Sequence, residues 1–208
     1  MKTILKIILS LFTLSLTSNV NASSEKITIG LDWFINPDHA PLIIAKKRNF
    51  FKDLNLDVQI IEPADPNDPP KLVAAGKLDI AISYHPQLHI QVDQGLPVAR
   101  IGTLVSVPLN SLVVLRDGPI KKISDLRGKK VGFSVGGFEE ALLSGMLQKN
   151  NLNMSDVNLV NINFSLSPSL IAKKVDAVIG AFRNFELNQM DIVNHPGRAF
   201  YPEEHGVP

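Results

Sequence analysis

The sequence contains no cysteine among its 208 residues. This absence excludes a disulfide framework, a thiolate nucleophile, a cysteine-ligated metal and a lipid-modified cysteine at a processing site. Neither charge sign is in excess, because 21 Lys and Arg residues stand against 20 Asp and Glu residues, without a basic stripe. Such a chain lacks the electrostatic footprint that binds nucleic acid. The composition therefore favours a small or neutral partner.

A hydrophobic run of the roughly 20 residues needed to cross a bilayer is also missing near the N-terminus. The apolar run there spans only 7–16, follows two lysines and precedes Val20-Asn21-Ala22. A charged start, a short apolar core and a small-x-small motif are typical of a cleaved secretory signal. We therefore predict a signal peptide over residues 1–22, cleavage after Ala22 and a monomeric protein in the periplasm.

Hydrophobic residues make up 45% of the chain, enough to fill the core of one large or two small domains. Periodicity, prolines and glycines predict strands at 27–31, 56–61, 78–83, 98–105 and 111–115, with helices at 41–48, 69–76 and 87–94. After a turn at 116–119 the alternation resumes over 123–133, with helices at 141–149 and 168–174 and strands at 157–162 and 176–180. The sequence predicts an α/β fold with largely parallel, helix-covered sheets, in which lobe 1 spans 23–117 and lobe 2 spans 118–208.

Ligands of open α/β sheets bind beyond the C-terminal ends of the strands. This rule selects Asp32-Trp33, Ser83-Tyr84-His85, the Gly136-Gly137 loop and residues 181–186 as the segments that face a cleft.

Three segments between residues 26 and 208 are distinctive: Asp32-Trp33-Phe34 followed by His39, Gly76-Lys77-Leu78-Asp79, and Leu126-Arg127-Gly128-Lys129-Lys130. With them, nearly all of 26–208 resembles the pyrimidine-precursor-binding proteins of thiamine salvage, which are type II periplasmic binding proteins. The second and third segments are shared with sulfonate and nitrate binders, so they indicate only the superfamily. The first segment is the more specific one.

The resemblance implies two α/β lobes that close on a heteroaromatic ligand and deliver it to an ABC permease with its ATPase. Trp33 and Tyr84 offer flat faces for stacking a pyrimidine, and Asp32 and Glu186 offer carboxylates to accept its exocyclic amine. The same residues also have structural interpretations. Trp33 could be a core aromatic, Tyr84 could seal a helix start, and Glu186 could be a solvated helix charge.

The Gly136-Gly137 loop precedes a helix, so free backbone N–H groups there could bind an acceptor or anion, although a plain glycine turn has the same pattern. His39 is a secondary candidate, because a loop-capping histidine is the commoner role. The sequence predicts no cofactor, no metal and no catalytic residue.

Two enzyme interpretations compete with binding. Residues 132–136 match the nucleophile-elbow pattern of serine hydrolases, and Asp176 and His205 follow in the hydrolase order. Glycines 136 and 137 delay the helix that an elbow needs directly after Ser134, and no oxyanion segment lies upstream.

The related pyrimidine-phosphate synthases need a lysine, a histidine and a cysteine-rich iron motif. Aligned from Gly76, the lysine position falls on Ser83 and the histidine position on Gln87, and no cysteine is present. The sequence therefore favours a non-catalytic binder, with the synthase and a sulfonate- or nitrate-type binder as alternatives.

Members of the resembled family are longer, because their chain returns from the second lobe to complete the first. This sequence ends at about the point where that return is expected. We therefore expect a C-terminally truncated binding protein, with a non-functional binder as a further alternative.

Overall fold

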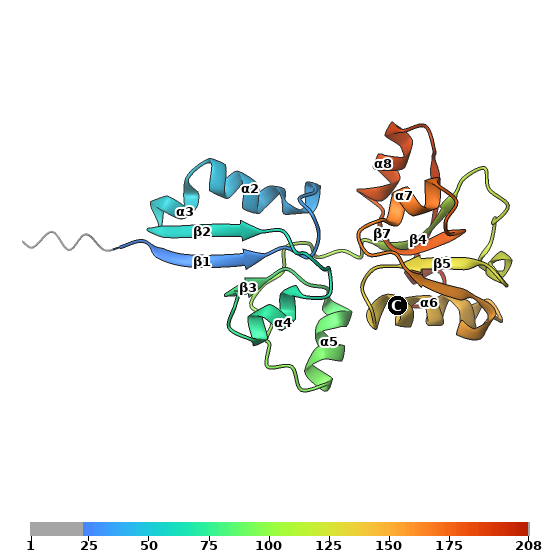
Figure 1. Ribbon diagram of the computed structural model, residues 1–208, viewed down its shortest axis with the longest axis horizontal. Helices are drawn as coiled ribbons and strands as arrows, with labels where there is room; N and C mark the ends of the chain where they lie inside the picture. The colour runs from blue at the N-terminus through green and yellow to red at the C-terminus, as the bar shows by residue number, and fades with distance from the viewer. Residues whose placement is uncertain (1–22, 208) are drawn as a thin grey trace, which may run out of the picture.

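Two separate β-sheets organise the chain in the computed structural model, which describes residues 23–207 (Figure 1). The first sheet is parallel and has the order β2-β1-β3, and the second is mixed and has the order β6-β5-β7-β4-β8. The predicted signal peptide lies outside the described residues. Within residues 23–207, no helix is long and apolar enough to cross a membrane.

The first unit follows the predicted alternation closely. Strand β1 (Glu25–Gly30) pairs along its whole length with β2 (Leu56–Ile61), whereas β3 (Ile80–Ala81) is much shorter than the strand predicted at 78–83. The helices are α2 (Ala40–Lys47), α3 (Phe50–Asp53), α4 (Pro69–Ala74) and α5 (His85–Asp93). Prolines in the first turns of α2, α4 and α5 favour helix starts, because these positions need no backbone donor.

The second unit has helices on both faces of its sheet, with α6 (Phe138–Lys149) on one side and α7 (Leu166–Ile171) and α8 (Glu186–Ile192) on the other (Figure 1). Its strands are β4 (Asn110–Leu115), β5 (Lys130–Phe133), β6 (Asn158–Asn161), β7 (Ala177–Phe182) and β8 (Gly197–Phe200). Strand β5 is parallel to β6 and β7, whereas β4 is antiparallel to β7 and β8.

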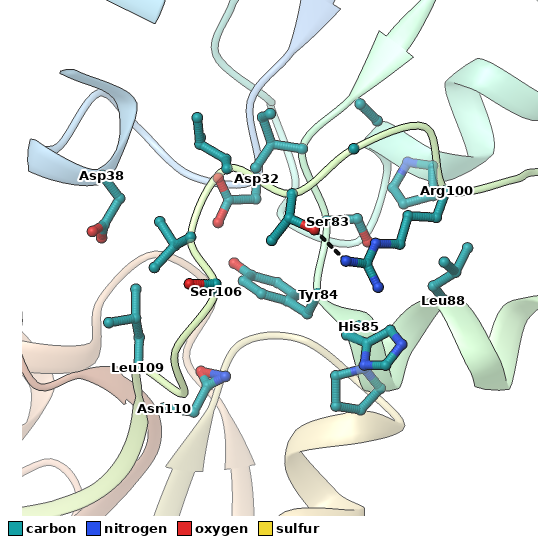
Figure 2. A pocket seen from close by; sticks show the side chains of 18 of the residues that line it. Asp32, Asp38, Ser83, Tyr84, His85, Leu88, Arg100, Ser106, Leu109 and Asn110 are labelled. Atoms are coloured by element: carbon teal, nitrogen blue, oxygen red, sulfur yellow. Dashed lines mark hydrogen bonds between the residues drawn. The ribbon is translucent and has the colours of Figure 1, made fainter. Parts of the chain in front are cut away.

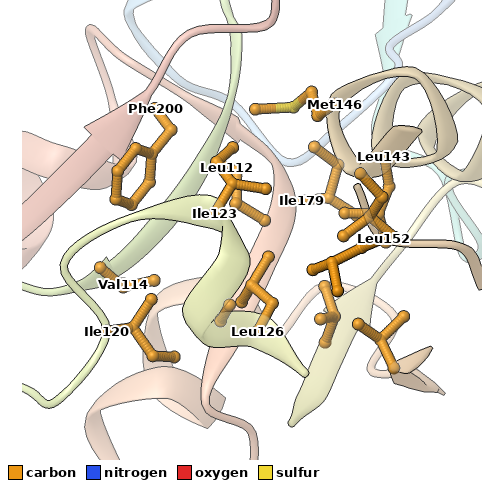
Figure 3. Close-up of a cluster of buried hydrophobic side chains, with 14 residues drawn as sticks. Leu112, Val114, Ile120, Ile123, Leu126, Leu143, Met146, Leu152, Ile179 and Phe200 are labelled. Carbon is orange, nitrogen blue, oxygen red and sulfur yellow. The ribbon is translucent and has the colours of Figure 1, made fainter. Parts of the chain in front are cut away.

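Strand alternation divides the core of the second unit into two clusters. On the α6 face, Leu112 and Ile179 pack with Leu143 and Met146 (Figure 3). On the other face, Val113 and other side chains pack against α7 and α8. At Gly180, with a φ of 94°, the register between β4 and β7 shifts, and Ala181 therefore joins the second cluster.

The structure corrects the prediction for residues 98–115. The segment 98–105 is not a strand, and residues 101–108 are exposed, with Ile101 79% accessible. Strand β4 belongs to the second sheet, so the chain enters that sheet before the predicted crossing at 116–119. Local alternation predicts an extended chain, but pairing with a distant strand decides which sheet it joins. The short helices α3 and α8 and the strand β8 were not predicted.

Candidate functional site

The loops after β1, β3 and β7 meet the start of α6 between the two units. Trp33, Tyr84 and Glu186, three of the predicted binding residues, line one small cavity there. Its volume is about 10 Å³, and its other lining residues are Asn36, Glu139, Leu166, Gly180, Phe182 and Phe185. Strand ends therefore converge as the strand-end rule predicts.

Trp33 belongs to the first unit by sequence but packs into the core of the second. Its ring meets Phe164 edge to face at 4.8 Å and Phe34 at 5.5 Å, and the side chain is 6% exposed. The indole Nε1–H is buried without a hydrogen-bond partner in the part of the chain that the structure describes. An unpaired buried donor is unfavourable, and an acceptor atom of a ligand would satisfy it.

Asp32 is buried and held by His39 through a hydrogen bond of 2.8 Å between His39 Nε2 and Asp32 Oδ1. The backbone N–H of Asn36 donates to His39 Nδ1 at 3.3 Å. Because Nδ1 accepts that bond, Nε2 is the ring nitrogen that donates to Asp32. His39 therefore orients the Asp32 carboxylate.

Tyr84 stands at the start of α5 with its ring 4.9 Å from that of Phe138 in the second unit. Burial, and then the charge of Asp32 and a hydrogen bond to it, raise the pKa of the Tyr84 hydroxyl well above its usual value. In Figure 2 the Tyr84 ring lies below Asp32, at the wall of a second, larger cavity. The hydroxyl stays protonated and serves as a hydrogen-bond donor.

Two buried glutamates face this region from the second unit. Burial raises the pKa of Glu139 to about 8 and that of Glu186 to about 7. Glu139 Oε2 accepts the Ser134 N–H at 2.8 Å, and Glu186 Oε2 accepts the Phe182 N–H at 2.6 Å. The Glu139 carboxylate packs against Gly180, where a Cβ atom would overlap it.

Glu139 was not predicted, because the sequence shows only an acidic residue in the first turn of a helix. Such a residue is usually solvated and interacts with the helix dipole. Its 2% exposure comes from the approach of β7, which local pattern does not reveal.

The backbone N–H groups of Gly136 and Gly137, which the sequence suggests are free to bind a ligand, already have partners in the structure. The Gly136 N–H donates to Asn67 Oδ1 at 2.9 Å, and the Gly137 N–H donates to Glu140 Oε2 at 2.7 Å. Neither glycine lines the two cavities. These N–H groups are therefore not free in this conformation, and binding a ligand there would require their bonds to open.

Hydrogen bonds from both sides hold the two units together over the cavity. Asn67 Nδ2 donates to the Ser134 carbonyl at 3.2 Å, so its amide makes two bonds to the loop after β5. On the other side, Asn184 Nδ2 donates to Asp38 Oδ1 at 2.6 Å. This conformation is therefore closed at the small cavity.

The larger cavity has a volume of about 720 Å³ and lies against the segment 98–110 (Figure 2). Asp32, Asp38 and His39 from the first unit also line it. It is thus adjacent to the carboxylate that Tyr84 and His39 contact.

The residues of the hydrolase interpretation do not form a catalytic group. Ser134 is fully buried, and its hydroxyl donates to the Asn163 carbonyl. Asp176 lies directly before β7, and its Oδ2 accepts the Lys130 N–H at 2.8 Å. A nucleophile elbow requires an exposed serine hydroxyl instead. At the synthase lysine position, Ser83 donates a hydrogen bond to Gln87 Oε1 at 2.9 Å.

Comparison with known proteins places this geometry in a family. The family model described as NMT1/THI5 like matches residues 36–208. A Haemophilus influenzae protein whose name assigns it to thiamine biosynthesis is 56% identical over 100% of this chain and 66% of its own length. The formylaminopyrimidine-binding protein of Halalkalibacterium halodurans is 30% identical over 92% of this chain and 58% of its own length.

A synthase of 4-amino-5-hydroxymethyl-2-methylpyrimidine phosphate from Schizosaccharomyces pombe is 29% identical over 76% of this chain and 45% of its own length. Among solved structures, the fold is similar to that of the alkanesulfonate-binding protein SsuA from Xanthomonas axonopodis pv. citri, bound to MOPS. The match covers 86% of this chain and 61% of the SsuA chain. The TM-score is 0.67 at 17% identity, which establishes a type II periplasmic-binding-protein fold. This chain spans about two thirds or less of the length of these proteins, and it belongs to the NMT1/THI5-like family.

Proposed function

We propose that this chain is an extracytoplasmic, non-catalytic solute-binding subunit that binds an aminopyrimidine precursor of thiamine and delivers it to an ABC permease with its ATPase. The observation that carries the proposal is the convergence of Trp33 and Tyr84 with buried carboxyl groups between the two units. The name of the Halalkalibacterium halodurans relative supports the ligand class.

The chemistry of the site suits a flat base with an exocyclic amine. Aromatic faces stack on a heteroaromatic ring, and carboxylates accept hydrogen bonds from an amine. Glu139 and Glu186, with pKa values near neutrality, can also present a protonated oxygen as a donor to a ring nitrogen. The unpaired Trp33 Nε1–H adds another donor.

Binding requires the two units to separate first. A cavity of about 10 Å³ holds at most one water molecule, so a pyrimidine does not fit the closed conformation. Opening would break the bonds of Asn67 and of Asn184, and closure over the ligand would restore them. A ligand that bridges the units favours the closed state through contacts made only there.

The acidic character of the site argues against a sulfonate ligand. Asp32, Glu139 and Glu186 are buried close to Tyr84, whose pKa all three raise by their charge. A sulfonate would place a negative charge beside the Asp32 carboxylate and beside two glutamates that ionise near neutral pH, which is unfavourable in a site of low dielectric. Ser83 at the lysine position likewise gives a synthase no amine to hold an aldehyde cofactor.

Calorimetric titration with formylaminopyrimidine and hydroxymethyl-aminopyrimidine tests the proposal. We expect binding of at least one of them and no heat with an alkanesulfonate. Glu186→Gln should weaken binding roughly tenfold, because a charge-assisted bond is lost. Trp33→Ala should cost about 1 kcal/mol or more of binding free energy, and Trp33→Phe, which keeps a ring, should cost less.

Each variant also needs a thermal melt, because Trp33 is part of the core. No heat with either pyrimidine, from a chain that melts cooperatively, would contradict the proposed ligand class. Binding of the alkanesulfonate alone would transfer the assignment to sulfonates.

A further inference from the structure

Two histidines on helix α5 face each other at the surface, apart from the small cavity. His85 and His89 are one helical turn apart, and their Nε2 atoms are 3.0 Å from each other. The rings meet edge to face with centroids 4.5 Å apart. Side chains four residues apart share one face of a helix, so both imidazoles project in the same direction.

The separation of the two nitrogens matches that of two ligands on one metal ion. Imidazole nitrogens bind zinc at about 2.0–2.1 Å, which places two of them about 2.9 Å apart at a right angle and about 3.3 Å apart at a tetrahedral angle. The observed 3.0 Å lies between these values. Two histidines spaced four residues apart on one helix form the paired ligands of known zinc sites.

Both rings are accessible to an ion from solution. His85 and His89 are exposed, and His85 also lines the 720 Å³ cavity (Figure 2). Within residues 23–207, neither ring has a hydrogen bond beyond the one that joins them. When an ion binds, the Nε2 proton of the donor ring moves through solvent to its own Nδ1, both Nε2 lone pairs then face the ion, and no other contact breaks.

We propose that His85 and His89 form a binding site for a divalent first-row transition ion such as zinc, bound through both Nε2 atoms. No group of three or more His, Cys, Asp or Glu side chains in the described residues is placed to enclose an ion. The site therefore has two protein ligands, and its remaining positions are open to water or to a donor atom of a molecule in the adjacent cavity.

Zinc titration by calorimetry tests the site, using the chain purified without a polyhistidine tag. We expect one ion per chain. His85→Ala and His89→Ala should each weaken zinc binding by at least roughly tenfold, since loss of a ligand costs no less than loss of an outer contact. His195→Ala is the matched control, because His195 is also exposed and should leave binding unchanged.

NMR of the unsubstituted chain gives a second measurement, which does not depend on whether a variant folds. Zinc should shift the imidazole resonances of His85 and His89 together, in proportion to the ion bound. The same 3.0 Å separation also suits a simple hydrogen bond between neutral rings. The proposal would be overturned by an absence of heat on adding zinc, by unchanged zinc binding in the variant that carries both His85→Ala and His89→Ala, or by a shift of the resonances of only one ring.

Discussion

The two units differ in how completely their sheets are covered. In the second unit, α6 packs on one face of the sheet and α7 and α8 on the other, and each face carries a cluster of buried side chains. In the first unit the buried aliphatic side chains are Ile29, Leu31, Val58 and Leu78. Large apolar side chains are exposed in both units, for example Leu54 at 72% in the first and Ile192 at 80% in the second, so the difference lies in the size of the buried cores.

The difference in buried core predicts that the two units differ in how easily they open locally. Local opening requires less free energy where few apolar contacts are buried. We therefore expect the second unit, which carries Glu139 and Glu186, to be the more rigid one. The first unit, which carries Asp32 and Tyr84, is the part that we expect to move.

Equivalent leucine truncations in the two units should have unequal costs. Leu143→Ala, in the fully buried cluster on α6, should lower the free energy of unfolding by about 2–5 kcal/mol. Leu78→Ala, at the smaller core of the first unit, should cost less than half as much because the site relaxes more easily. Urea unfolding measures both, and Leu54→Ala should stay within about 0.5 kcal/mol of the parent. Equal costs would remove the difference between the units.

The buried carboxyls make the stability of the second unit depend on pH. Glu139 and Glu186 have folded-state pKa values of about 8 and about 7, raised from 4.5. The folded state therefore holds protons that the unfolded state has already lost. Stability should fall as pH rises from about 4.5 to about 8, by up to about 1.4 kcal/mol per pH unit for each group.

Glu139→Gln, which mimics the protonated form, should flatten this fall in thermal melts recorded across the same range. The carboxyls with lowered pKa values, Asp65, Asp79, Asp125 and Glu203, act at lower pH, near and below about 4. Their titration therefore does not mask the fall in stability expected between about pH 4.5 and pH 8. A stability that rises between pH 5 and pH 8 would contradict the protonation of these two glutamates.

Alanine substitutions at two glycines with positive φ, one in each unit, test how tightly each unit is packed. Gly180 in β7 has a φ of 94° and faces the Glu139 carboxylate, whereas Gly76 after α4 has a φ of 67° and open space within 4 Å of the position that a Cβ atom would take. Alanine at Gly76 should cost about 1 kcal/mol from backbone strain alone. Gly180→Ala adds a steric overlap, so its total should reach about 1–3 kcal/mol or more. Equal costs in chemical unfolding would show that the carboxylate moves aside freely.

The smallest expected effect concerns the bonds between the units. Asn67→Ala removes two hydrogen bonds to the loop after β5, worth about 1–2 kcal/mol of closure free energy. The radius of gyration from small-angle scattering should increase as the open state becomes populated. Asn150→Ala, which removes a side-chain bond to the Met146 carbonyl within the second unit, is the control and should leave the radius unchanged. An unchanged radius for Asn67→Ala would mean that other contacts keep the units closed.

Much of the local structure is readable from the chain alone. Alternating residues predict β1 and β2 within two residues of their observed ends, and prolines and glycines predict α4 and α5. The strand-end rule selected Trp33, Tyr84 and Glu186, which the structure brings to one cavity, and their role in binding a ligand stays a prediction. The helix and strand predictions succeed because periodicity, helix starts and strand ends depend on neighbours in sequence.

Other features depend on residues far apart in the chain. Strand β4 joins the second sheet because β7 and β8 pair with it, and 98–105 lacks a strand because no pairing partner is present among the described residues. The burial of Glu139 against Gly180 and the two hydrogen bonds of the Asn67 side chain also form only between segments that folding brings together. Sheet membership, burial and closure are long-range contacts, and a local pattern carries no information about which distant segment will supply them.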